Sequence, residues 1–125
     1  MHKDSKKKIA AMLISAAKSN GTCSFARVFE FFQKGIDKNI VFKALEDAAS
    51  SIAPPELANY TSLMALGNTN FPGDGFFNTF KIKRSAEYEE IAGGSTPTLK
   101  LSLEQKAEIT SRERSRVYNH AASLP

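Results

Sequence analysis

Two adjacent prolines, Pro54 and Pro55, constrain this chain more than any other feature, because an α-helix cannot continue through them. Ahead of them, apolar side chains recur at the spacings of three and four residues that are typical of helices. Behind them, the pattern changes to alternation and turn residues. A chain of 125 residues has the usual size of one domain. We therefore expect a single domain, 1–125, with a helical first part and a mixed second part.

Three amphipathic helices are predicted ahead of the prolines. Asn20-Gly21 supplies a left-handed stop for the first, and Ser24 and Asp37 are suitable N-caps for the second and third. The predicted ranges are 5–18, 25–33 and about 38–51, after a basic tail at 1–5. The second and third helices are then joined by a short connection that contains Gly35, as in helix-turn-helix units.

The pattern behind the prolines predicts a strand, a turn and a last helix. Residues 60–66 alternate like a strand, and the stretch 67–75 is rich in turn residues. Residues 76–83 fit either the returning strand of a hairpin or a short helix, because a short apolar run does not settle the period. Residues 93–100 are expected to form a loop, and a helix is expected over about 102–121. The predicted fold class is therefore α+β and mostly helical: a winged helix-turn-helix with a small β-hairpin and a C-terminal helix.

Four stretches of the chain form a recognisable set of motifs: Ser24-Phe25-Ala26-Arg27-Val28, Pro54-Pro55 with Tyr60-Thr61-Ser62-Leu63-Met64-Ala65-Leu66, Phe71-Pro72-Gly73-Asp74-Gly75-Phe76-Phe77, and Glu113-Arg114-Ser115-Arg116-Val117-Tyr118. Together they resemble a family of small proteins from bacteria, phages and mobile elements that have no established function. The motifs cover most of the chain, although residues 56–59 depart from the family pattern. The resemblance implies a winged-helix-like core and an origin in a phage or mobile element.

The order of elements also resembles, more weakly, the winged-helix DNA-binding module of the alkyltransferase-like proteins, which place their third helix against DNA. Their reactive Pro-Cys-His-Arg motif is absent here, and the lone cysteine, Cys23, lies at the expected start of the second helix. Alkyl transfer is therefore not supported.

Catalytic and metal chemistry lack suitable residues. A nucleophilic cysteine needs a base, usually histidine, but His2 and His120 lie near the two termini and far in sequence from Cys23. The same three residues do not have the spacing of metal ligands. The glycine-rich stretch 70–75 carries no phosphate-loop pattern and favours a tight turn pinned by Phe71. We expect a protein that is not an enzyme and needs no cofactor.

Charge makes DNA a candidate partner. The net charge is +4, and residues 1–19 alone hold five Lys against one Asp. In a winged helix the third helix would read duplex DNA, which assigns that role to Lys38, Asn39, Phe42 and Lys43. The predicted phosphate contacts are Lys6, Lys7, Lys8, Lys81, Lys83 and Arg84. Glu46 and Asp47 weaken this hypothesis, because a groove-facing helix seldom carries adjacent acids. The alternative is a protein-binding module of the same fold, such as an inhibitor of a host defence or regulatory complex.

Compartment and oligomeric state follow from a few residues. A single cysteine excludes an internal disulfide and favours the cytoplasm. The basic start and the apolar residues 9–17 have the outline of a signal peptide, but cleavage there would remove a helix that the core needs. No apolar run is long enough to span a bilayer. Nine Phe in so small a chain also suggest a homodimer that would cover some of them.

Overall fold

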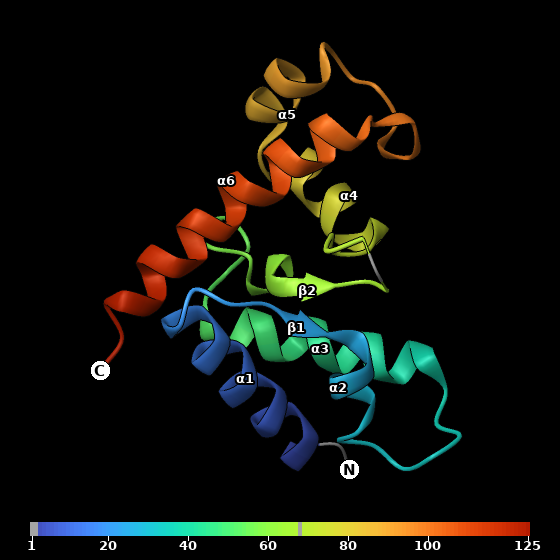
Figure 1. Cartoon of the computed structure of the whole chain (residues 1–125), viewed down its shortest axis with the longest axis vertical. Coiled ribbons are helices and arrows are strands. Elements are labelled where there is room, and N and C mark those ends of the chain that lie inside the picture. The colour runs from blue at the N-terminus through green and yellow to red at the C-terminus, as the bar shows by residue number, and fades with distance from the viewer. Residues whose placement is uncertain (1–2, 68) are drawn as a thin grey trace.

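The computed structural model describes residues 3–67 and 69–125. It is mostly helical with one small sheet, in agreement with the expected α+β class (Figure 1). In chain order the elements are α1 (Lys3–Lys18), β1 (Cys23–Ser24), α2 (Phe25–Phe29), α3 (Lys38–Ile52), the 3₁₀ helix η1 (Tyr60–Leu63), β2 (Met64–Ala65), α4 (Asp74–Lys83), α5 (Ser85–Ala92), the 3₁₀ helix η2 (Thr98–Lys100) and α6 (Leu103–Ala122). None of the helices within the described ranges is both long and apolar enough to cross a membrane.

The local signals for helix ends work as expected. Asn20 adopts a φ of 55° after α1, in the left-handed region. The Arg27 N–H donates to Ser24 Oγ at 3.3 Å, and the Asn39 N–H donates to Asp37 Oδ1 at 2.8 Å. Ser102 and Gln105 form a reciprocal capping box at the start of α6. The predicted first, third and last helices are therefore confirmed to within about two residues.

Two parts of the predicted winged helix-turn-helix are wrong. The second helix stops at Phe29, so α2 and α3 are joined by residues 30–37, a longer connection than the short turn of a helix-turn-helix unit. The expected hairpin is absent from the described residues, because 74–83 form α4. In place of a hairpin, β2 pairs in parallel with β1, with Cys23 opposite Met64. A helix forms at α4 because its spacing puts Phe76, Phe77 and Phe80 on one buried face.

Two apolar cores lie side by side, and α6 runs along both (Figure 1). The first core is formed by α1, α3 and η1, with Val117 and Ala121 from the second half of α6. The second is formed by α4 and α5, with Ile109 from the first half of α6. A 20-residue helix is long enough, at about 1.5 Å per residue, to serve both cores.

A buried ion pair joins the two cores. Glu113 of α6 is 1% exposed, and its carboxylate accepts from Arg84 Nε at 2.7 Å and from Arg84 Nη2 at 3.1 Å. The same carboxylate accepts from the Asn59 N–H at 2.9 Å, and Arg84 also donates to the Pro55 carbonyl at 3.2 Å. Arg84 stands between α4 and α5, so this pair fixes the break between them to α6 and to the segment after the prolines.

The next residue of α6, Arg114, ties down the chain around β2. Its guanidinium donates to the carbonyl oxygens of Ser62 at 2.7 Å, Met64 at 3.2 Å and Asn70 at 2.9 Å. These bonds give a donor from α6 to backbone carbonyl groups in η1, in β2 and in the turn that follows. Arg114 therefore holds η1, β2 and the following turn against α6.

Most of the phenylalanine side chains are buried or partly buried within one chain. Phe76, Phe77 and Phe80 are buried in the second core, and five others are partly buried. Phe42 of α3 is the exception at 37% exposure. Few Phe side chains are therefore left for a homodimer to cover, and the homodimer stays a prediction.

Candidate functional site

The predicted DNA-binding cations of α1 and α3 are partly neutralised by one carboxylate. Asp47 accepts from Lys43 Nζ at 2.7 Å and lies 3.1 Å from Lys6 Nζ. Hydrogen bonds from Lys43 and then Lys6 lower the pKa of Asp47 below its usual value, so its negative charge persists in mild acid. Lys6 and Lys43 therefore already have a counter-charge.

The three predicted phosphate-binding residues at the end of α4, Lys81, Lys83 and Arg84, are also engaged. Arg84 is held by Glu113, and Lys83 Nζ lies 3.5 Å from Glu56 Oε2. Lys81 donates to the Ser95 carbonyl at 3.3 Å and lies over the Tyr88 ring. Lys81, Lys83 and Arg84 therefore each have a partner within the described chain. Sequence reasoning could not see this, since a cation on its own does not reveal its partner.

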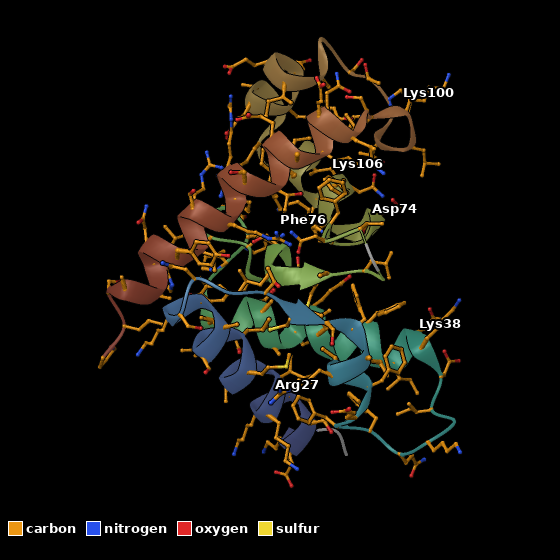
Figure 2. The ribbon with its side chains drawn as sticks, in the orientation of Figure 1. Arg27, Lys38, Asp74, Phe76, Lys100 and Lys106 are labelled. Carbon is orange, nitrogen blue, oxygen red and sulfur yellow. The ribbon has the colours of Figure 1, made fainter. Side chains whose placement is uncertain are left out.

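Four of the predicted residues are exposed and make no side-chain ion pair or hydrogen bond with the rest of the described chain. They are Lys7, Lys8, Lys38 and Asn39. Figure 2 places Lys38 at the outer end of α3, away from the second core. These residues are the part of the predicted DNA surface that is still available.

A groove of about 430 Å³ lies between α3 and the start of α4. This volume falls in the range of about 300–1,000 Å³ that is usual for ligand sites. Asp74 and Phe76 lie at the start of α4 (Figure 2), and both line the groove. The apolar residues that line the groove include Phe25, Phe42, Leu45, Met64, Leu66 and Phe76.

Small residues keep the groove open. On the side of α3 its wall includes Ala49 and Ser50 of the helix and its C-cap Ala53, which cover little of the helix surface. On the other side it includes Gly73 and Gly75, where an added Cβ would meet no atom within 4 Å. The turn-rich sequence before α4 thus has a second effect besides reversing the chain, since it leaves space beside α3.

Apolar side chains at the groove stay in contact with water. Phe42 is 37% exposed and Leu66 is 50% exposed. Phe42 is nevertheless held in place by edge-to-face packing on Phe25, with ring centroids 5.8 Å apart, and on Phe29, at 6.2 Å. The groove therefore presents a fixed aromatic wall to solvent.

Besides three hydroxyl groups, the polar lining of the groove includes Glu46 of α3, Asp74 of α4 and Asn59, which lies just before η1. In the sequence, Glu46 counts only against DNA binding. Asn59 was missed, although an Asn ahead of Tyr60-Thr61 has the pattern of a cap. In the structure it caps η1, because its Oδ1 accepts from the Thr61 N–H at 3.0 Å.

Cys23 is 6% exposed, and burial raises the pKa of its thiol, an effect that nearby Arg27 partly offsets. Because the thiolate is the reactive form, we expect a thiol reagent such as dithionitrobenzoate to react at least about tenfold more slowly with the folded protein than with the unfolded chain in urea. Equal rates would contradict the burial of Cys23. The measurement also tests the expectation that this cysteine is structural.

The chain matches no protein-family profile, no curated protein and no solved structure.

Proposed function

We propose that this protein is a binding module that is not an enzyme, and that it holds a segment of another protein in the groove between α3 and α4. The observation that carries the proposal is the exposed apolar lining of this groove. Exposed apolar surface that is concave and rigidly supported is typical of binding sites. Phe42 and Leu66 would lose contact with water on binding, which supplies the favourable free energy.

The chemistry of the groove favours binding over catalysis. Its hydroxyl groups come from Ser50, Thr61 and Thr79, and among the described residues neither a His nor a Lys lines it to act as their base. Its ionisable groups are the carboxylates of Glu46 and Asp74, which stand on different elements. A cytoplasmic partner in a host defence or regulatory complex is the form of this function that the resemblance to phage and mobile-element proteins favours.

Filling the groove should abolish binding. Ser50 is exposed and lines the groove, so Ser50→Trp is expected to occupy it without disturbing either core. We would pan a library of random nine-residue peptides against immobilised protein. The result expected is enrichment on the native protein that is lost on Ser50→Trp, because the indole ring takes the place of the peptide's apolar side chain.

The neighbouring variant Ser51→Trp is the matched control, since Ser51 is exposed on the same helix but does not line the groove. It should enrich the same peptides as the native protein. Enrichment that survives in Ser50→Trp would place the binding surface elsewhere, and failure to enrich any peptide on the native protein would overturn the proposal.

DNA binding is the second candidate, and it is favoured by the exposed, unpaired Lys7, Lys8 and Lys38 of α1 and α3. The order α1, α2, α3 would still be that of a winged-helix core, with α3 as the reading helix and only its first turn free to enter a major groove. A gel shift with long duplex DNA at low salt decides this candidate. No retardation would exclude it, and Lys38→Glu with Lys43→Glu should abolish any retardation that depends on α3.

Asp47 offers a sharper test of DNA binding. Asp47→Asn removes the counter-charge of Lys6 and Lys43, so both side chains become free for phosphates. We expect tighter binding to duplex DNA and a salt dependence steeper by about 1 to 2 log units of affinity per log unit of salt. An unchanged slope would mean that Lys6 and Lys43 do not reach the DNA. Glu89→Gln, which alters an exposed acid on α5, is the control for net charge.

A further inference from the structure

We propose that the segment held in the groove carries a large apolar side chain next to Lys or Arg. This inference rests on the proposed function and adds the chemistry of the partner. Three features of the groove support it: its apolar lining, two unpaired carboxylates and a set of unused hydrogen-bond donors.

The charge of the groove selects a basic partner. Glu46 and Asp74 both line it, and within residues 3–67 and 69–125 neither forms an ion pair. They stand on α3 and at the start of α4, so a peptide between the two walls would meet a carboxylate on each side. A Lys or Arg beside the apolar side chain would pair with them, whereas an acidic residue would be repelled.

The same two carboxylates make the groove unsuitable for DNA, which is the partner in the second candidate function. A DNA phosphate brought to the groove would face Glu46 and Asp74 without an opposing cation, because no Lys or Arg of residues 3–67 and 69–125 lines it. We therefore expect DNA phosphates to bind at Lys7, Lys8 and Lys38, which form no ion pair within the described residues, and a basic protein segment to bind in the groove.

Unused donors in the groove suit the backbone of a peptide. Asn59 is 8% exposed and lines the groove, and its Oδ1 is taken by the Thr61 N–H and hydroxyl. Its side-chain nitrogen has no partner in the part of the chain that the structure describes. Water still reaches this nitrogen, so it is free to donate to a carbonyl oxygen of the bound segment instead.

The start of α4 adds two more donors. Gly73 is the N-cap and has no side chain to accept from the first N–H groups of the helix. Among the described residues, no backbone or side-chain acceptor bonds the N–H groups of Asp74 and Gly75. The negatively charged carboxylate of Asp74 lies in the same first turn of α4 and would repel a second anion. These two N–H donors therefore suit a neutral peptide carbonyl better.

The composition of the peptides selected from the nine-residue library tests the inference. We expect the sequences enriched on the native protein to share one aromatic or large aliphatic residue with Lys or Arg within two positions of it, well above their frequency in the library. Enriched peptides without excess basic residues, or with excess acidic ones, would overturn this inference and leave the proposed function standing. No enriched peptide at all would overturn the proposed function itself.

A charge-reversed groove provides the second test. In Glu46→Lys with Asp74→Asn, the affinity for a selected basic peptide should fall about tenfold in fluorescence anisotropy at low salt, and the difference should shrink at high salt. The control is Asp4→Asn with Glu89→Lys, which changes net charge by the same amount at exposed positions outside the groove. Equal losses in both variants would mean that net charge, and not the groove, selects the peptide. A circular dichroism melt of each variant verifies that the fold is kept.

Discussion

Glu113→Gln is expected to lower the free energy of unfolding by about 3–5 kcal/mol, the usual cost of removing one member of a buried ion pair. The variant would leave the Arg84 guanidinium, whose side chain is 15% exposed, without its counter-ion between the two cores. Gln keeps an oxygen that can accept from the Asn59 N–H, so the loss reports the charge and not that hydrogen bond. Urea unfolding followed by circular dichroism measures it.

Two companion variants show whether the effect comes from the pair. Glu108→Gln removes a half-exposed carboxylate that bonds Arg112 one turn away on α6, and it should cost less than about 1 kcal/mol. Arg84→Met combined with Glu113→Gln should be more stable than Glu113→Gln alone, because no charge is then left buried without a partner. A double variant that is less stable than the single one would refute this account of the ion pair.

Arg114→Met is expected to have the next largest effect, a loss of about 3 kcal/mol of unfolding free energy. The guanidinium of Arg114 bonds three backbone carbonyl groups, and Met can replace its packing but none of its hydrogen bonds. The carbonyl groups of Ser62 and Met64 would then lie beside α6 without a donor. Because Met64 also lines the groove, the affinity for a selected peptide should fall as well.

The control for Arg114→Met is Arg112→Met, which removes ion pairs to Glu87, Glu90 and Glu108 at a more exposed position. It should cost less than Arg114→Met and leave peptide binding unchanged. If both variants lose the same stability and the groove still binds peptide in Arg114→Met, then Arg114 does not position β2.

Helices with a long apolar period and a recognisable cap could be predicted from sequence. These signals predicted α1, α3 and α6 correctly. Asp37 marks the start of α3, and Ser102 marks the start of α6. It was insufficient for α4, because a ten-residue segment with Phe at 76, 77 and 80 fits a strand edge or a helix until its neighbours are known. The two-residue strands β1 and β2 have no periodicity of their own, and they pair because tertiary packing brings them together.

The candidate site was less predictable than the fold. The groove forms where α3 meets the turn before α4, and no local pattern encodes that approach. Charge alone suggested that Arg84 contacts DNA, whereas its geometry makes it half of a buried pair with Glu113, 29 residues away in sequence. Conversely, Glu46 counted only against DNA binding in the sequence, and it became informative once the structure placed it in an apolar groove with Asp74.

The route of α6 has a consequence for how the protein is made. Val117 and Ala121 are fully buried in the first core, and the Tyr118 hydroxyl donates to the Gly21 carbonyl across 97 residues of chain. While a ribosome is still synthesising the last turns of α6, helices α1 and α3 have been translated but cannot close their core. Their apolar faces then remain available to chaperones until these residues emerge, so the nascent chain should fold late and in one step.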